Sequence, residues 1–406
     1  MNPAEVLEEP LCDTGNNPID YLCRQRETGL GPRVAILVEY ATGASLPEEI
    51  ARSAPMRALR AAFADIVHLR NGGNAVFERF FGYAPQRAAD MVHDLIMTRL
   101  RHFDHIVHSE IDTQRPETTS YVNGLRDCLA RELPALRVTA TRVRSLLSRA
   151  GAELLSPARP LARVNLRLPY PTRVNPALDA VRRHAVSWAA RMGMLSGPVW
   201  TEQRFHAMDF GLLAALTHPD AEPAKLELAS DWHVWLRYLD GVSGARTRPV
   251  QRGLADLLSR SSLESRQVTT LMENRARLRE PDPIELLERR RADGVFAAAL
   301  LGISDPALVN TFADVTTLHT DLFSYPRQLG KPGNVVLAVQ RFLDCTLAEA
   351  VKVTSDLSSR RLRQFERRAT NASNVDKLRD WLAGHLLWHQ VCTPAVMGGF
   401  RDRVVG

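Results

Sequence analysis

Arginine side chains provide the strongest chemical signal in this sequence of 406 residues. They concentrate at residues 289–291 and again at Arg360, Arg361, Arg363, Arg367 and Arg368. Because a guanidinium group binds phosphate oxygens through a fork of N–H donors, such clusters can hold a diphosphate or the backbone of a nucleic acid. We favour the solvated face or end of a helix, because phosphate-binding patches usually contain aromatic residues or glycine between their basic residues. A diphosphate pocket and a nucleic-acid surface are the alternatives.

Histidine and cysteine residues show no spacing typical of a metal site. His102, His105 and His108 flank Asp104, but steps of three residues drift around a helix and no cysteine accompanies them. The cysteines are scattered without paired spacing, which is typical of reduced thiols in the cytoplasm: Cys12, Cys23, Cys128, Cys345 and Cys392. No apolar run approaches the roughly 18 residues of a membrane-spanning helix. We therefore expect a cytoplasmic protein without a membrane partner.

Helices are the elements that must position these side chains. Apolar residues recur at steps of three and four over most of the chain, which predicts an all-α fold. The composition is 45% hydrophobic and 24% charged, which excludes a disordered chain. Residues 1–32 are rich in Pro, Gly, Asp and Asn and predict a loose leader. Residues 113–164 predict a linker with two short helices, around 121–131 and 141–154.

Two pairs of similar segments indicate an internal duplication. Phe63–Asn71 matches Phe312–Thr320 at an offset of 249 residues, and Phe80–Phe103 matches Phe342–Phe365 at an offset of 262. One such match between amphipathic helices could arise by chance, whereas two collinear matches with a single gap favour duplication. The first copy then lacks the counterpart of Asp321–Gly333.

The second copy carries motifs that resemble a known family. The segments that carry them are Leu168–Pro171, Asn175–Asp179, Met192–Leu195, Leu228–Asp240, Thr320–Gln328 and Asp380–Gly384. Together they resemble the two-domain germacradienol/geosmin type of bacterial class I terpene synthase. The resemblance implies an all-α class I terpene synthase-like helical barrel, incomplete here, over residues 165–395. It identifies residues 33–112 as the remnant of a first domain.

The resemblance also implies a chemistry. Such enzymes are Mg²⁺-dependent lyases that ionise and cyclise farnesyl diphosphate inside a sealed apolar cavity. A diphosphate leaving group needs hard cations, and these need oxygen ligands. By resemblance the metal ligands are Asp240, Thr320, Ser324 and Gln328, with Asp240 as the catalytic carboxylate. The diphosphate is expected to meet the sensor Arg290 and Arg327, with Asp293 as the linker and Gly294 as the helix-breaking residue.

Several positions depart from the family pattern in ways that remove charge. Gly241 and Ala245 stand where the family has acidic residues, while Thr320 and Gln328 offer only neutral oxygens. Pro326 falls inside the segment Thr320–Gln328, where it would remove a helical hydrogen bond. The family's C-terminal Arg-Tyr pair corresponds to Pro394-Ala395.

The sequence therefore predicts a truncated, degenerate relative with weak or no cyclase activity on farnesyl diphosphate. The alternative is a non-catalytic, Arg-rich helical binding protein, with nucleic acid the less expected partner. The aromatic residues that could face a carbocation also lie on apolar helical stripes, and we favour a core role for them: Trp235, Tyr238, Phe323 and Trp388. His389, beside Trp388, is expected to be structural in the same way.

Overall fold

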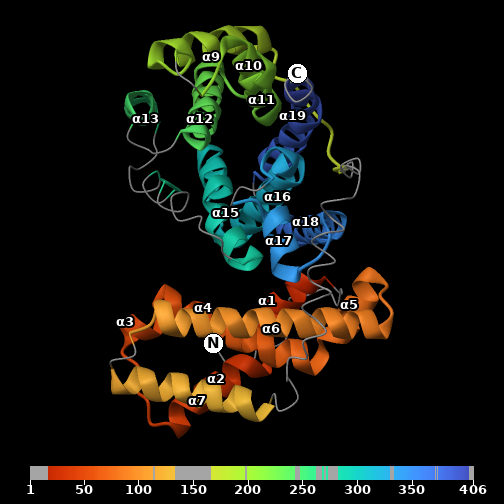
Figure 1. Ribbon diagram of the computed structural model, residues 1–406. Coiled ribbons are helices and arrows are strands. Elements are labelled where there is room, and N and C mark those ends of the chain that lie inside the picture. Colours follow the sequence, from red (N-terminus) through yellow and green to blue (C-terminus); the bar gives the residue numbers. More distant parts are fainter. Residues whose placement is uncertain are drawn as a thin grey trace. The chain divides into compact units, whose positions relative to one another are not determined.

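The computed structural model describes most of the chain in two compact units (Figure 1). The described residues are 17–112, 115–132, 166–196, 199–242, 247–261, 268, 271–272, 282–329, 333–370, 372 and 374–401, with the backbone alone for Arg327 and 393–401. Unit 1 comprises Met1–Ala162 and Gln340–Glu349, and unit 2 comprises Arg163–Val339 and Ala350–Gly406. Within the described ranges both units consist of helices without a strand, so the all-α prediction is confirmed.

Unit 1 is built around the packing of α4 against α6 (Figure 1). Its helices are α1 (Pro18–Thr28), α2 (Leu30–Ala41), α3 (Glu48–Ala51), α4 (Ala54–His68), α5 (Asn74–Phe81), α6 (Pro85–Ser109) and α7 (Pro116–Glu132). A π-helical turn, η2 (Leu69–Gly73), joins α4 to α5. Fully buried aromatic side chains form its centre: Phe63, Phe77, Phe103 and Tyr121.

The leader predicted at residues 1–32 is helical from residue 18 onwards, which corrects that expectation. The side chain of Asn17 accepts hydrogen bonds from the backbone N–H groups of Ile19 and Asp20, and Pro18 occupies the first turn. Both features start a helix, because they satisfy or remove its unpaired N–H donors. Ile19 and Leu22 are then buried in unit 1. The first 16 residues lie outside the described part of the chain.

The linker prediction also needs correction at its start. The first of its two helices is present as α7, which is longer than expected and packs on α2 and α4 as part of unit 1. Gly124 makes this contact close, since a Cβ there would lie 2.6 Å from a methyl carbon of Val38. The second expected helix, residues 141–154, lies outside the described residues.

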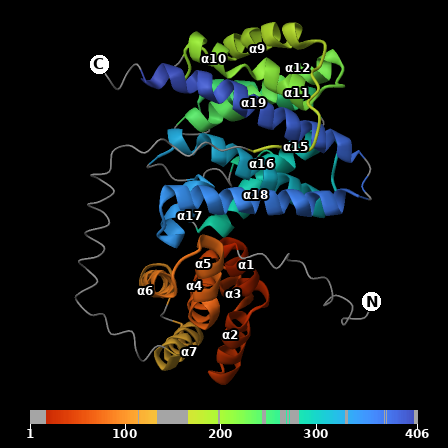
Figure 2. The same cartoon turned by 90° about the vertical axis from the view of Figure 1, so that its right-hand side faces the viewer.

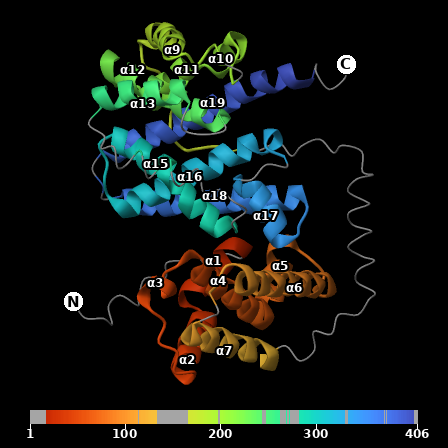
Figure 3. The same cartoon turned by 60° about the vertical axis from the view of Figure 1, so that its left-hand side comes forward.

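Unit 2 contains the longer series of helices. These are α9 (Leu178–Met192), α10 (Glu202–Met208), α11 (Phe210–Thr217), α12 (Pro223–Gly241), α13 (Arg248–Arg260), α15 (Pro283–Leu300), α16 (Pro306–Ser324), α18 (Leu347–Ala369) and α19 (Val375–Arg401). Helix α11 packs against α9, α12 and α19 (Figure 2). Helices α15 and α16 form the most extensive helix pair (Figure 3). Helices α17 (Val335–Leu343) and α18 contain the residues 340–349 that cluster with unit 1.

The aromatic residues named from the sequence lie mainly in the core of unit 2. Trp235, Tyr238 and Trp388 belong to one large cluster together with Trp188 and Trp232. A second cluster surrounds Phe312, Phe365 and Trp381. Phe323 is half-buried and stacks on His389 at 5.4 Å between ring centroids. Among the described helices, none has both the length and the apolar composition to pass through a lipid bilayer.

An arginine–aspartate–arginine triad stabilises unit 1. Arg26 donates from Nε and Nη2 to the two carboxylate oxygens of Asp65, each at 2.7 Å. Arg99 donates from Nε to the same carboxylate at 3.1 Å. The Asp65 side chain is fully buried, so the two guanidinium groups compensate a charge that water does not reach.

Unit 2 contains the matching triad, which supports the predicted duplication. Arg291 donates to both carboxylate oxygens of Asp314 at 2.6 and 3.0 Å, and Arg361 pairs with the same carboxylate at 3.2 Å. The sequence match aligns Asp314 with Asp65 and Arg361 with Arg99. Two of the three residues in each triad therefore stand at aligned positions, which supports the predicted duplication.

The gap between the two copies has a visible structural consequence. In unit 2, α16 ends at Ser324 and a 3₁₀ turn, η3 (Tyr325–Arg327), follows before α17 begins. In unit 1, α4 passes through η2 directly into α5. A π-helical turn accommodates more residues than an α-helical turn, so it can absorb a change of length inside a helix. The η2 turn thus stands at the position where the alignment of the two copies places the predicted gap.

Candidate functional site

The predicted diphosphate sensor, Arg290, is engaged by the protein itself. Its Nη1 atom donates to the carboxylate of Asp321 at 2.5 Å and to the carbonyl oxygen of Gly333 at 2.8 Å. The second oxygen of Asp321 accepts from the backbone N–H of Val335 at 2.7 Å. Asp321 is completely buried and Arg290 is largely so. Helices α15 and α16 thus bring together a buried ion pair in which Nη1 of Arg290 and both carboxylate oxygens of Asp321 are hydrogen-bonded within the protein.

Carboxylates determine the electrostatics around Arg290. Burial lowers its pKa, but Asp321, Asp293 and Asp240, in that order, raise it, and the net direction is upward. Burial raises the pKa of Asp321, and the charge of Arg290 opposes that rise. The charge of the guanidinium group is therefore stabilised mainly by the carboxylate of Asp321.

Two predicted metal ligands, Ser324 and Gln328, both accept a hydrogen bond from Asn334, which the sequence analysis did not identify. The Nδ2 group of Asn334 lies 3.3 Å from Ser324 Oγ and 3.0 Å from Gln328 Oε1, and both oxygens accept from it. It also lies 3.1 Å from the carbonyl oxygen of Asp321. Asn334 is fully buried and its Oδ1 caps α17 by accepting from Val336 N at 2.9 Å. The available signal was an asparagine directly before an apolar run, which is typical of a helix N-cap.

Only part of the segment Thr320–Gln328 is helical in the way that its predicted metal ligands require. Thr320 and Ser324 lie one turn apart on α16 and both are buried. The helix ends at Ser324, because Pro326 cannot continue its hydrogen-bond ladder, so Gln328 lies beyond η3 instead of on the same helical face. This corrects the expectation of one continuous ligand face through Gln328.

Asp240 stands at the end of α12 with its carboxylate exposed. It pairs with Arg237 of the same helix at 3.8 Å, and 46% of its side chain is accessible to solvent. Gly241 follows as the last residue of α12 and cannot supply a second carboxylate. Ala245 lies outside the described residues, as do the side chains of Arg327, Pro394 and Ala395.

Gly294 is not a break in the helix, contrary to the expectation from the resemblance. Helix α15 runs without interruption from Pro283 to Leu300. A Cβ at Gly294 would lie 2.4 Å from Ala313 Cα, so the residue permits a close approach of α15 and α16.

The donor set does not fit a cluster of magnesium ions. Mg²⁺ prefers several anionic oxygens in octahedral geometry. The oxygens of Asp321 are taken by Arg290 and a backbone N–H, and those of Ser324 and Gln328 accept from Asn334. Over the part of the chain that the structure describes, no three His, Cys, Asp or Glu side chains gather in an arrangement that could hold a metal.

The arginine clusters are largely used for internal contacts. In the first, Arg289 pairs with Glu285, and Arg291 pairs with the buried Asp314. The second contains further internal pairs, namely Arg360 with Asp356, Arg361 with Asp314, and Arg368 with the carbonyl oxygen of Ala307. Charges compensated in this way contribute less to the binding of a phosphate backbone.

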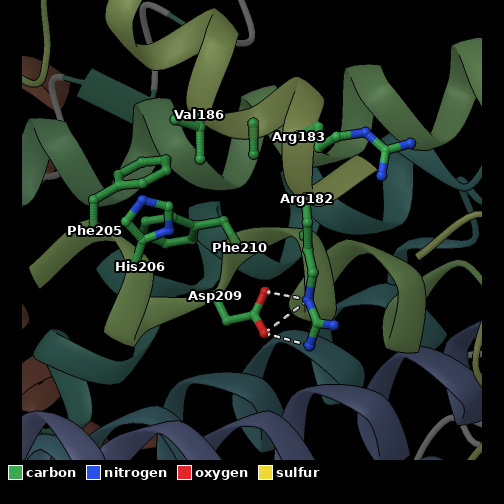
Figure 4. Close-up of a pocket in the computed structure, with 9 residues that line it drawn as sticks. Arg182, Arg183, Val186, Phe205, His206, Asp209 and Phe210 are labelled. Atoms are coloured by element: carbon green, nitrogen blue, oxygen red, sulfur yellow. Dashed lines mark hydrogen bonds and ion pairs between the residues drawn. The ribbon is translucent and has the colours of Figure 1, made fainter. Parts of the chain in front are cut away.

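A small cavity of about 230 Å³ lies between α9 and the joint of α10 and α11 (Figure 4). Phe205 and Phe210 form one side, while Arg182 and Asp209 form the other. Arg182 donates to both oxygens of Asp209 at 2.6 to 3.2 Å, and Asp209 also caps α11. This arginine positions the joint between the two helices, so its charge is not available to a ligand.

Comparison with known proteins identifies the relationship. Residues 13–72 match the family model described as terpene synthase family 2, C-terminal metal binding. Pristinol synthase of Streptomyces pristinaespiralis is 35% identical over 107 residues, a match that covers 25% of this chain and 28% of that protein. The 4-epi-cubebol synthase of Streptosporangium roseum is 35% identical over 102 residues, covering 24% of this chain and 31% of the relative. The chain thus spans less than a third of either protein in these matches.

A longer match is found with a third protein. The (+)-T-muurolol synthase of Roseiflexus castenholzii, described as cyclising (2E,6E)-farnesyl diphosphate, is 25% identical over 294 residues, covering 56% of this chain and 89% of that protein. Among solved structures, germacradien-4-ol synthase from Streptomyces citricolor superimposes with a TM-score of 0.44 at 20% identity, over 56% of this chain and 98% of that one. Over these parts of its length the chain is similar to terpene synthases of bacteria.

Proposed function

We propose that the chain is a degenerate terpene synthase of the germacradienol/geosmin type, with weak or no cyclase activity on farnesyl diphosphate. The observation that carries this proposal is the buried pair of Arg290 with Asp321. A sensor arginine must offer its guanidinium group to an incoming diphosphate. Here that group is bound to a carboxylate and to a backbone carbonyl.

Electrostatics supports the same proposal. An ionising diphosphate releases negative charge, which preorganised cations must stabilise. Ser324 and Gln328 would contribute neutral oxygens that already accept from Asn334, and Asp240 is a solvated carboxylate paired with Arg237. Loss of one preorganised group can lower a rate by about 10² to 10³, and several are altered together here.

Prenyl diphosphate remains part of the proposal as a weakly held ligand. Because Asp321 competes internally for Arg290, binding of an anion there requires the ion pair to open, and buried ion pairs are expensive to break. Farnesyl diphosphate is thus expected to bind less tightly here than in a relative whose sensor arginine is accessible.

The test is incubation of the purified chain with farnesyl diphosphate and Mg²⁺, followed by pyrophosphate release and gas chromatography of the volatile products. We expect turnover far below the range of about 1 s⁻¹ and above that is typical of enzymes. Formation of a farnesyl-derived alcohol or olefin at such a rate would overturn the proposal.

A revertant separates lost metal ligands from an unsuitable cavity. The variant Gly241→Asp, Thr320→Asn, Gln328→Glu restores the oxygens that the resemblance implies. If the cavity is sound, any trace activity should increase. A folded revertant without activity would locate the loss in the cavity walls. The matched control carries Thr346→Asn, at an exposed position directly before α18 and outside the proposed ligand set.

The alternative, an Arg-rich helical binder of nucleic acid, is less well supported by the contacts. Arg291 and Arg361 are held by the buried Asp314. Binding to DNA that falls steeply between 50 and 200 mM salt, from a useful starting affinity, would favour this alternative.

A further inference from the structure

Unit 1 contains a cavity that the proposed function does not use. It measures about 290 Å³ and lies between α2, α4 with η2, and α7. Its walls are apolar and come from all three helices: Leu30, Val34, Phe63, Ile66, Val67 and Leu129. Ligand sites in proteins are typically concave, mostly apolar and marked by a few polar groups.

The polar groups of this cavity are unevenly distributed. Arg70, Asn71 and Arg131 also line it, and all three residues are exposed to solvent. Cys128, which is partly buried, is the remaining polar side chain of the lining. The lining therefore combines apolar side chains with two guanidinium groups and one amide that belong to residues exposed to solvent. This combination matches a ligand with an aliphatic body and an anionic end.

Apolar surface continues from the cavity along α2. Leu30, which lines the cavity, is 53% exposed, and Leu37 and Tyr40 are 64% and 88% exposed farther along the same helix. Exposed apolar groups on one helix favour the approach of a hydrophobic ligand from solvent. The polar end of such a ligand would be held where Arg70 and Arg131 lie.

We propose that this cavity binds a linear aliphatic molecule of medium chain length with one anionic head group, a carboxylate or a phosphate monoester, without a metal ion. Its walls exclude water from the chain, while Arg70 and Arg131 bind the head group through charge-assisted hydrogen bonds. The proposal concerns unit 1 alone and does not depend on whether unit 2 turns over a prenyl diphosphate.

Calorimetric titration of the full chain tests this proposal. The ligands are decanoate, decyl phosphate and the neutral decanol, each in the presence of EDTA. We expect saturable binding of at least one anion, with at least tenfold weaker binding of decanol. The anion that binds more tightly, decanoate or decyl phosphate, identifies the preferred head group. Absence of saturable binding for both anions would overturn the proposal.

Variants locate the binding within the molecule. Val67→Trp fills the cavity and is expected to weaken binding of the anion at least tenfold. Arg70→Glu combined with Arg131→Glu is expected to weaken binding of the anion at least tenfold, while the affinity for decanol changes by less than twofold. Arg57→Glu, on an exposed position of α4 outside the lining, is the matched control and should leave both affinities unchanged. Equal losses in the control and in the double variant would contradict the assignment.

Cysteine alkylation provides a readout that does not rely on a substitution. Cys128 lines the cavity and Cys23 does not, although both thiols are partly exposed. Saturating decanoate or decyl phosphate is expected to slow alkylation of Cys128 by N-ethylmaleimide at least fivefold and to leave Cys23 unaffected, as followed by peptide mass spectrometry. Equal protection of both thiols, or of neither, would argue against binding in this cavity.

Discussion

At the scale of single residues, the ion pair of Arg290 and Asp321 determines what the central part of unit 2 can do. Sequence reasoning identified Arg290, because a three-arginine cluster resembles the family's sensor segment. It did not identify Asp321, because the ligand spacing directed attention to residues 320, 324 and 328. Only the approach of α15 to α16 shows that the arginine and the aspartate share their charges.

Removing this carboxylate should destabilise unit 2 strongly. Asp321→Ala leaves a buried guanidinium group uncompensated, and loss of one partner of a buried pair costs about 3 to 5 kcal/mol. The measurement is urea denaturation followed by circular dichroism. Asp240→Ala, which removes an exposed carboxylate, is the control and should change the free energy of unfolding by less than about 0.5 kcal/mol. Similar losses in the two variants would contradict the assigned role of Asp321.

Buried histidines should make unit 2 sensitive to acid. Burial lowers the pKa of His218 and His319 to about 4 and that of His233 to about 3, and it lowers the pKa of His385 well below its usual value. The unfolded chain then binds protons below about pH 6.5 that the folded chain does not. Stability is therefore retained above pH 6.5 and is lost as the pH falls towards 4.

This acid sensitivity is measured as the urea midpoint between pH 7 and pH 5. His319→Phe removes one group with a lowered pKa and should reduce the dependence of the midpoint on pH. His105→Gln, on an exposed position of α6, is the control and should leave that dependence unchanged. The hydrogen bond of His184 to Asp231, first among its causes, raises the pKa of His184, so its contribution has the opposite sign and is lost as the pH rises above 6.5. If the urea midpoint changed equally with pH in all variants, the buried imidazoles would not control the loss of stability in acid.

At the scale of elements, the contact of α15 with α16 depends on the absence of one side chain. Gly294→Ala would place a Cβ 2.4 Å from Ala313 Cα, so the helices must separate. Overpacking of this kind costs about 1 to 3 kcal/mol. Ala313→Gly introduced into the same variant removes the second methyl group in contact and should restore part of the loss. The measurement is a double-mutant cycle on the free energy of unfolding, and strictly additive effects would contradict direct contact.

Element boundaries show where sequence reasoning succeeded and where it did not. Periodicity predicted helices over residues 33–110 and 121–131, and both regions are helical. It missed α1, because proline, glycine and asparagine in residues 1–32 were interpreted as a loop composition. Asn17 and Pro18 instead serve as helix-start residues. The same residue types favour a loop or a helix start, and burial of Ile19 and Leu22 decides between them.

At the scale of the whole molecule, each unit has its own arginine–aspartate–arginine triad. Asp65→Ala should therefore destabilise unit 1 locally, and Asp314→Ala should destabilise unit 2 locally. Hydrogen exchange with mass spectrometry is the measurement. We expect faster amide exchange in α4 and α6 for the first variant, and in α15 and α16 for the second. Uniform acceleration across both units in either variant would show that they unfold as one body.

The sequence by itself predicted the helical class, which the structure confirms, and the similarity to terpene synthases, whereas the duplication with its gap stays a prediction. These properties depend on local periodicity and on side-chain identity along the chain, which a single sequence records. The tertiary structure alone showed that Asp321 forms an ion pair with Arg290. It also showed that Asn334 donates hydrogen bonds to the side-chain oxygens of Ser324 and Gln328, and that α15 continues through Gly294. Pairing between residues 31 positions apart depends on how two helices pack, because their side chains acquire partners only when the chain is folded.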